Sequence, residues 1–195
     1  MNIQKYRKIS VQLVSEDDDV SGETDAVSAH LGEGLLHRAI SVFLFRLNEE
    51  GKPDLLLQKR SAEKIVGAQL WANSACGNVR PGESYLDCAL RRLHDELGIS
   101  NVELNAISMF RYQVQCSTKF SENEMDQVFA GWFDGEVALN PDEVSEVAWV
   151  AWNDLTQIQT APKQYAPWLE LLLADANSMH ALSTWLQNKK DQYAK

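Results

Sequence analysis

Residues 77–99 read GNVRPGESYLDCALRRLHDELGI, and they predict a loop that leads into an amphipathic helix at residues 83–97. Gly98 follows the helical pattern directly, as is typical of a helix C-cap. Arg92 and Glu96 are one turn apart on a face of the expected helix that carries none of its recurring leucines, so we expect them to be free for chemistry. Leucines recur at helical spacing and predict a single apolar stripe on another face of the helix: Leu86, Leu90, Leu93 and Leu97.

A second motif, Glu122-Asn123-Glu124, has two carboxylates with one residue between them. Side chains at positions i and i+2 of a strand point to the same face, so both carboxylates are expected to converge. Cys76 supplies a thiol directly before the helical segment. A thiol and clustered carboxylates together suit proton transfer and the binding of a metal ion.

Composition restricts the class of protein. The chain has 195 residues, of which 45% are hydrophobic and 24% charged, so we expect one domain over residues 1–195 with its core at about residues 35–157. The net charge of −10 disfavours nucleic acid and anionic membranes as partners. Three dispersed cysteines, no signal-peptide pattern and no apolar stretch long enough to cross a bilayer predict a cytoplasmic protein with reduced thiols.

The remaining periodicity predicts a mixture of strands and helices. Strands are expected at residues 9–14, 39–47, 54–60, 102–115, 122–133 and 144–152, and helices at residues 165–176 and 179–190. The order of strands, one central helix, more strands and terminal helices predicts an α+β or layered α/β fold with a mixed sheet. An N-terminal strand segment and C-terminal helices would flank the core.

The helical segment resembles the Nudix box, a loop–helix–loop motif that holds a divalent metal ion against a diphosphate. Matching residues at the motif's spacing are Gly77, Glu83, Arg91, Leu93, Asp95, Glu96, Gly98 and Ile99. Helix carboxylates one turn apart suit a hard cation, which prefers oxygen ligands. The alternative is a solvated charged helix, on which Glu/Arg pairs are common. Arg92 stands where hydrolytic members carry Glu, which argues against a hydrolase.

From about residue 9 to residue 189 the chain resembles type 1 isopentenyl-diphosphate Δ-isomerases of the Nudix superfamily. Segments that carry the resemblance are His30, His37, Lys59-Arg60, Lys64, residues 71–77, Arg91-Arg92, Glu96, Phe110-Arg111-Tyr112, residues 122–124 and Pro167-Trp168. The resemblance implies a Nudix-type mixed β-sheet sandwiched by helices. It also implies conversion of isopentenyl diphosphate to dimethylallyl diphosphate, by protonation of one face of the alkene and loss of a proton from the other.

The same resemblance implies a role for each matching side chain. Proton transfer falls to Cys76, Glu124 and Tyr112. Substrate binding falls to Arg60, Lys64 and Arg92 at the diphosphate and to Trp168 over the hydrocarbon tail. The implied metal ligands are Glu96 for Mg²⁺, and His30, His37, Glu122 and Glu124, with Asn78 at the position of a further ligand, for a second ion, Mn²⁺ or Zn²⁺. A tryptophan face can stabilise developing positive charge by about 0.5–2 kcal/mol.

Two positions depart from the isomerase pattern. Asn78 stands where the family usually has a third histidine ligand, and an amide oxygen suits Mg²⁺ better than a transition metal. Ala26 stands where the family usually has a lysine, so one diphosphate contact is expected to be missing. Both departures fall in the implied active site and leave the expected fold unchanged.

The sequence therefore predicts a divalent-metal-dependent isomerase that acts on a small prenyl diphosphate. Two alternatives stay open: a Nudix diphosphohydrolase of another organic diphosphate, and a catalytically inactive binding protein on the same fold. The retained pair of Cys76 and Glu124 argues against both. No oligomeric state is specified by the sequence, and a monomer is compatible with it.

Overall fold

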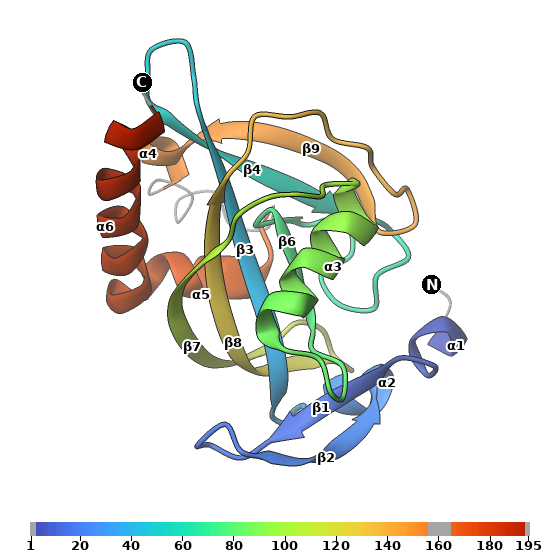
Figure 1. The fold of residues 1–195 in the computed structure, drawn as a ribbon. Coiled ribbons are helices and arrows are strands. Elements are labelled where there is room, and N and C mark those ends of the chain that lie inside the picture. The colour runs from blue at the N-terminus through green and yellow to red at the C-terminus, as the bar shows by residue number, and fades with distance from the viewer. Residues whose placement is uncertain (1–2, 156–164, 194–195) are drawn as a thin grey trace.

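A computed structural model describes residues 3–155 and 165–193. Its mixed sheet carries helices on both faces (Figure 1), as the sequence predicts for an α+β fold. The strands are β1 (Ser10–Val14), β2 (Val20–Asp25), β3 (His37–Leu47), β4 (Pro53–Arg60), β5 (Trp71–Ala72), β6 (Ala75–Asn78), β7 (Asn105–Gln115), β8 (Ser121–Trp132) and β9 (Val144–Ala151). The helices are α1 (Ile3–Tyr6), α2 (Ala26–His30), α3 (Tyr85–Leu97), α4 (Trp152–Leu155), α5 (Pro167–Ala174) and α6 (Ala176–Tyr193).

Strand β3 is the central strand of the sheet and pairs with β1, β4, β6 and β8. It runs parallel to β8, with His37 opposite Glu124, and antiparallel to β6, with Ser41 opposite Cys76. Strand β7 pairs with the other edge of β8 and places Tyr112 opposite Glu124. The topology thus brings residues from four distant strands to one region of the sheet.

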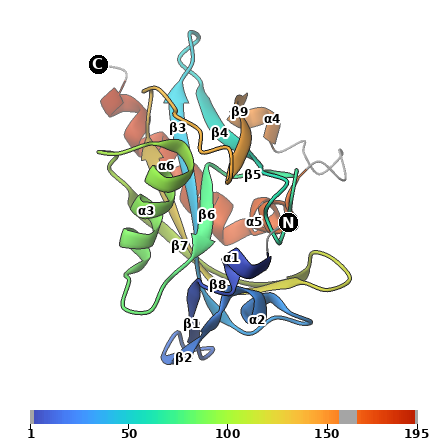
Figure 2. The same ribbon diagram turned by 90° about the vertical axis from the view of Figure 1, so that its right-hand side faces the viewer.

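Two apolar cores fill the space between the sheet and its helices. One lies under α3, between that helix and one face of β3, β4 and β8. The other lies on the opposite face, where α5 and α6 cover the sheet. Figure 2 shows α3 on one side of β6 and α5 on the other. Within the described residues, no helix is both long and apolar enough to cross a membrane.

Helix α3 differs from the sequence prediction in its start and in its buried face. It begins at Tyr85, because Ser84 accepts a hydrogen bond from the Asp87 N–H and forms a capping box with it. Gly98 closes the helix in the left-handed conformation, as predicted. The prediction that the four leucines form a single apolar stripe is wrong, since Leu86 and Leu90 are 43% and 37% exposed.

Small residues explain why the buried face is rotated from the leucine stripe. Cys88 and Ala89 are fully buried, and the Cys88 thiol lies 3.4 Å from the Asn78 carbonyl oxygen of β6. A helix can approach a strand this closely only where its facing side chains are small. The rotation turns Glu96 inward as well, so this side chain is buried where we expected it to be free.

A pair of alanine substitutions tests this assignment of the buried face. Leu93→Ala should lower the free energy of unfolding by about 2–5 kcal/mol, because it leaves a cavity in a closed core. Leu90→Ala should lower it by less than about 1 kcal/mol, because this side chain is partly in solvent. Chemical denaturation of both variants measures the difference. Equal losses would mean that the leucine stripe, and not the face observed here, is buried.

Most predicted strands are present with boundaries shifted by a few residues, and both C-terminal helices are present. The structure adds several short elements that the sequence reading missed, chiefly β2, α2 and β6. β2 is largely exposed and lacks apolar alternation, and α2 spans five residues, so neither has a periodic signal. Asp25 nevertheless caps α2 by accepting hydrogen bonds from the Val27 and Ser28 N–H groups.

Candidate functional site

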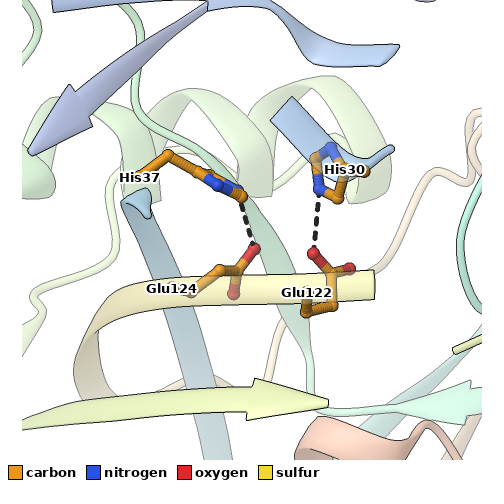
Figure 3. Close-up of side chains that lie close together, drawn as sticks. All are labelled: His30, His37, Glu122 and Glu124. Carbon is orange, nitrogen blue, oxygen red and sulfur yellow. Dashed lines mark ion pairs between the residues drawn. The ribbon is translucent and has the colours of Figure 1, made fainter. Parts of the chain in front are cut away.

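Four buried side chains meet at the end of the sheet where β3 begins. His30 comes from the last turn of α2, His37 from the start of β3, and both carboxylates from β8 (Figure 3). His30 Nε2 lies 2.8 Å from Glu122 Oε2, and His37 Nε2 lies 3.3 Å from Glu124 Oε1. One ligand atom from each residue lies within 4.8 Å of the other three. The structure thus brings together the two histidines and two glutamates that the sequence analysis assigned to the second ion.

Backbone carbonyls orient both imidazole rings toward the carboxylates. Nδ1 of His30 is 2.6 Å from the Ala26 carbonyl oxygen, and Nδ1 of His37 is 2.7 Å from that of Leu35. With Nδ1–H donating to a carbonyl, each neutral ring presents the lone pair of Nε2 to the centre of the cluster. This is the tautomer that a metal-binding histidine uses.

The cluster contains buried polar atoms with few partners. Beyond the contacts of His37 Nε2 with Glu124 and of Glu122 Oε2 with His30, these two atoms make no hydrogen bond within the part of the chain described. Burial alone would lower the pKa of His30, but the Glu122 carboxylate raises it to about 9. Burial and the neighbouring Glu122 charge raise the pKa of Glu124. Two imidazoles and two carboxylates with unsatisfied atoms fit a divalent metal ion.

The thiol and the tyrosine of the predicted proton-transfer group line the same pocket as Glu124. Arg60 Nη1 lies 3.0 Å from Cys76 Sγ, on the short strand β6. Burial raises the pKa of Cys76 to about 11, against the opposing effect of the Arg60 charge. On the β8 side the Tyr112 hydroxyl donates a hydrogen bond to Glu124 Oε2, and burial raises the pKa of this tyrosine. With both pKa values raised, the Cys76 thiol and the Tyr112 hydroxyl retain their protons at neutral pH.

The predicted diphosphate-binding cations surround a buried carboxylate. Glu96 Oε1 accepts hydrogen bonds from Lys64 Nζ at 3.0 Å and from Arg92 Nη2, and Gln58 Nε2 donates to Glu96 Oε2 at 2.9 Å. Burial opposes ionisation, but the charges of Arg92 and Lys64 hold the pKa of Glu96 below its usual range. Glu96 is therefore an ionised carboxylate, fully buried behind the pocket-lining Lys64 and Arg92, and these partners explain how its charge is tolerated.

The third predicted cation and the aromatic residue lie together on the other side of Cys76. The Arg60 guanidinium lies over the Trp168 ring, 4.9 Å from its centroid, and Arg60 Nε donates to the Val66 carbonyl oxygen. Trp168, at the second position of α5, is buried and lines the pocket. Arg60 thus contacts both the thiol and the aromatic ring, and all three residues line the same pocket.

Two residues of the predicted box, Arg91 and Glu83, form an ion pair with each other. Arg91 donates to both oxygens of Glu83, at 2.6 and 2.9 Å, and to the Asn78 carbonyl oxygen at 3.3 Å. These bonds tie the loop before α3 to the middle of the helix. Asn78 and Ala26, the two departures from the isomerase pattern, both line the pocket.

Two carboxylates near the site received no role in the sequence analysis, and of these Glu143 lines the pocket. Glu143 lies in the loop before β9 and contacts Lys64, Arg92 and Lys5, yet no spacing in the sequence marks it. Asp126 was placed on the face of Glu122 and Glu124 but received no role. It is buried, and Ser41 Oγ donates to its Oδ2 at 2.7 Å.

Comparison with known proteins identifies relatives over most of the chain. A family profile described as NUDIX domain matches residues 36–172. An isopentenyl-diphosphate Delta-isomerase of Serratia proteamaculans is 39% identical, over 86% of this chain and 92% of the relative. Isopentenyl-diphosphate Delta-isomerase 2 of Aromatoleum aromaticum is 37% identical, over 89% of each chain. The crystal structure of DR0079 from Deinococcus radiodurans is 22% identical with a TM-score of 0.67, over 85% of this chain and 97% of that one, which supports the fold.

Proposed function

The chain belongs to the NUDIX family, and we propose that it is an enzyme that converts isopentenyl diphosphate to dimethylallyl diphosphate. The observation that carries this proposal is the pocket itself, in which Cys76 and the Tyr112–Glu124 pair lie with a group of cations. Relatives named isopentenyl-diphosphate Delta-isomerase over nearly the same length support the same reading.

Proton transfer at two carbons is the chemistry that these groups can perform. Isomerisation adds a proton to the terminal alkene carbon and removes one from the carbon two positions away. We assign one transfer to Cys76 Sγ and the other to the Glu124 carboxyl with its Tyr112 hydroxyl. Because the conversion is reversible, each group accepts a proton in one direction and donates it in the other. A positioned acid or base contributes about 10²–10⁴-fold to a rate.

Binding and charge stabilisation fall to the surrounding side chains. We assign the diphosphate to Arg60, Lys64 and Arg92, because Arg and Lys recognise phosphate oxygens through charge-assisted hydrogen bonds. Trp168 would cover the hydrocarbon tail and stabilise positive charge that develops on the alkene, by about 0.5–2 kcal/mol. Its burial supports the exclusion of water from that charge.

The two metal positions belong to different parts of the pocket. We propose that His30, His37, Glu122 and Glu124 hold Mn²⁺ or Zn²⁺, and that Glu96 holds the Mg²⁺ of the diphosphate. A divalent ion in the first position would supply charge that sets the basicity of the Glu124 carboxyl. In the second position it would neutralise the diphosphate.

The remaining features of the proposal concern the protein as a whole. We propose that residues 1–195 act as one domain in the cytoplasm, on a small-molecule substrate. All three cysteines, at positions 76, 88 and 116, are free thiols, which supports a reducing compartment.

Incubation of the purified protein with isopentenyl diphosphate and Mg²⁺ tests the function. We expect dimethylallyl diphosphate to form, and we expect EDTA to stop the reaction until Mg²⁺ and Mn²⁺ are restored. Product analysis by NMR distinguishes this result from its alternatives. Release of inorganic phosphate would indicate a diphosphohydrolase, and binding without turnover would indicate an inactive binding protein. Isomerisation that resists EDTA would contradict the metal dependence.

The Asn78→His substitution tests the departure in the first metal position. A third imidazole should tighten binding of Zn²⁺ or Mn²⁺ by at least about 10–100-fold. Loss of a residue that only orients a metal ligand already changes metal affinity by this factor. Binding of Mg²⁺ with diphosphate at Glu96 should change little. Calorimetric titration of both proteins with each metal measures this selectivity. Equal transition-metal affinity before and after the change would place position 78 outside the metal's ligand shell.

A further inference from the structure

We infer that Glu143 is a second carboxylate ligand, beside Glu96, for the Mg²⁺ that accompanies the diphosphate, and that the Lys64 ammonium holds this cation position in the metal-free protein. The inference rests on the proposed function, because it concerns the same diphosphate pocket. Glu143 lines that pocket, although it lies 47 positions after Glu96 and outside the Nudix-box segment.

Lys64 lies between the carboxylates of Glu96 and Glu143. Lys64 Nζ lies 3.0 Å from Glu96 Oε1 and 2.5 Å from Glu143 Oε2, so one cation is shared by one oxygen of each carboxylate. Arg92 Nη2 contacts the same two oxygens. Two carboxylate oxygens that converge on one cationic centre are the arrangement by which proteins hold Mg²⁺, with substrate phosphates and water completing the shell.

Backbone hydrogen bonds fix the two carboxylates relative to each other. The Asn140 N–H donates to the Glu96 carbonyl oxygen at 3.0 Å, and the Ala138 N–H donates to that of Leu97 at 2.9 Å. On the other side, the Ser61 N–H donates to the Glu143 carbonyl oxygen at 3.0 Å. The loop before β9 is therefore attached to the C-terminal turn of α3 and to the end of β4. A site built on such attachments keeps its geometry without a bound ion.

A buried amide beside Glu96 provides an independent sign of a missing ligand. Gln58 is fully buried, and its Nε2 donates to Glu96 Oε2 at 2.9 Å. Its Oε1 makes no hydrogen bond within the described part of the chain. A buried amide oxygen without a partner is uncommon, and a water on a metal ion at Glu96 is a donor that would satisfy it.

Charge then links the metal to the diphosphate. The side chain of Lys64 is only 5% exposed, so an ammonium displaced from Glu96 and Glu143 needs another anion in the pocket. The diphosphate is that anion. Mg²⁺ that replaces Lys64 between the carboxylates would free the lysine for phosphate oxygens, so each ligand strengthens the binding of the other.

Calorimetric titration with inorganic pyrophosphate tests this coupling without relying on turnover. One equivalent of Zn²⁺ is present throughout, so that the His30–His37–Glu122–Glu124 cluster takes no Mg²⁺. In the unaltered protein we expect Mg²⁺ to tighten pyrophosphate binding by at least about tenfold. In Glu143→Gln we expect this gain to fall about tenfold, while binding without Mg²⁺ becomes tighter because a competing anion is gone. Glu146→Gln, on the exposed face of β9, is the matched control and should behave like the unaltered protein.

Titrations with and without Mg²⁺ distinguish a Glu143 that binds the metal ion from a Glu143 that only neutralises the positive charge of the pocket. If Glu143 only neutralises, its loss strengthens pyrophosphate binding equally with and without Mg²⁺, and the inference is overturned. Glu143→Asp keeps the charge but shortens the reach, so it should lose the Mg²⁺ gain without the gain in metal-free binding. Thermal unfolding of each variant confirms that it is folded. Failure of the unaltered protein to bind pyrophosphate in either arm would instead overturn the proposed function.

Discussion

Cys76→Ala is expected to lower the rate of isopentenyl diphosphate isomerisation by about 10²–10⁴-fold, because it removes one of two positioned proton carriers. The substitution deletes a single sulfur from a strand whose backbone pairing with β3 it leaves intact. The substrate's diphosphate and tail contacts involve other side chains, so KM should change much less than kcat. Steady-state kinetics of the purified variant measures both parameters.

Cys116→Ala provides a matched control for the thiol. Cys116 is also a partly buried free thiol, but it is not among the residues that line the pocket. Its rate should stay within about twofold of the unaltered protein, since surface and rim substitutions away from a site have small effects. Near-native kcat in Cys76→Ala would show that the thiol only packs beneath Arg60, and the assignment of proton transfer would then fail.

The fold was largely predictable because its strands and its central helix carry strong periodic signals. Strand β3 is rich in β-branched and aromatic residues and nearly all buried, and the turn after it contains Gly51 and leads into Pro53, the first residue of β4. The buried face of α3 was not predictable from leucine spacing. Which face is buried depends on how closely Cys88 and Ala89 let the helix approach β6, and that distance is a tertiary property.

The candidate site was predictable only where a motif or a resemblance pointed to it. His30 lies on a five-residue helix and carries no pattern of its own, so its place beside Glu122 depended on the resemblance. Glu143 had no such support. It reaches the cations because Asn140 and Ser61 attach its loop to two other elements, and hydrogen bonds between residues so far apart in the chain leave no local trace in the sequence.

Asp126 is an intermediate case, in which strand alternation predicts the face of the side chain but not its surroundings. Strand alternation correctly placed this residue on the face of Glu122 and Glu124. Its burial and its bond to Ser41 depend on β3 lying parallel to β8, because Ser41 comes from that neighbouring strand. Burial and the Glu124 charge raise the pKa of Asp126 well above its usual range. Periodicity thus predicts the direction of a side chain, and the sheet order determines what it meets.

Glu124→Gln is expected to lower isomerisation by about 10²–10⁴-fold even when the His/Glu cluster is saturated with metal. Glu122→Gln should also weaken metal binding, since both carboxylates belong to the cluster, but its activity should recover at high metal concentration. The difference arises from contacts. Only Glu124 accepts the Tyr112 hydrogen bond, whereas Glu122 lies against His30.

The activity of Glu124→Gln and of Glu122→Gln, measured against metal concentration, distinguishes a carboxylate that transfers a proton from one that only binds the metal ion. The amide in Glu124→Gln can still accept a hydrogen bond from Tyr112, so the fold and the tyrosine's position should be retained. It cannot exchange a proton with the substrate, and added Mn²⁺ or Zn²⁺ cannot replace that function. If both variants recovered alike at saturating metal, Glu124 would be a ligand only. The second proton carrier opposite Cys76 would then have to be the Tyr112 hydroxyl itself.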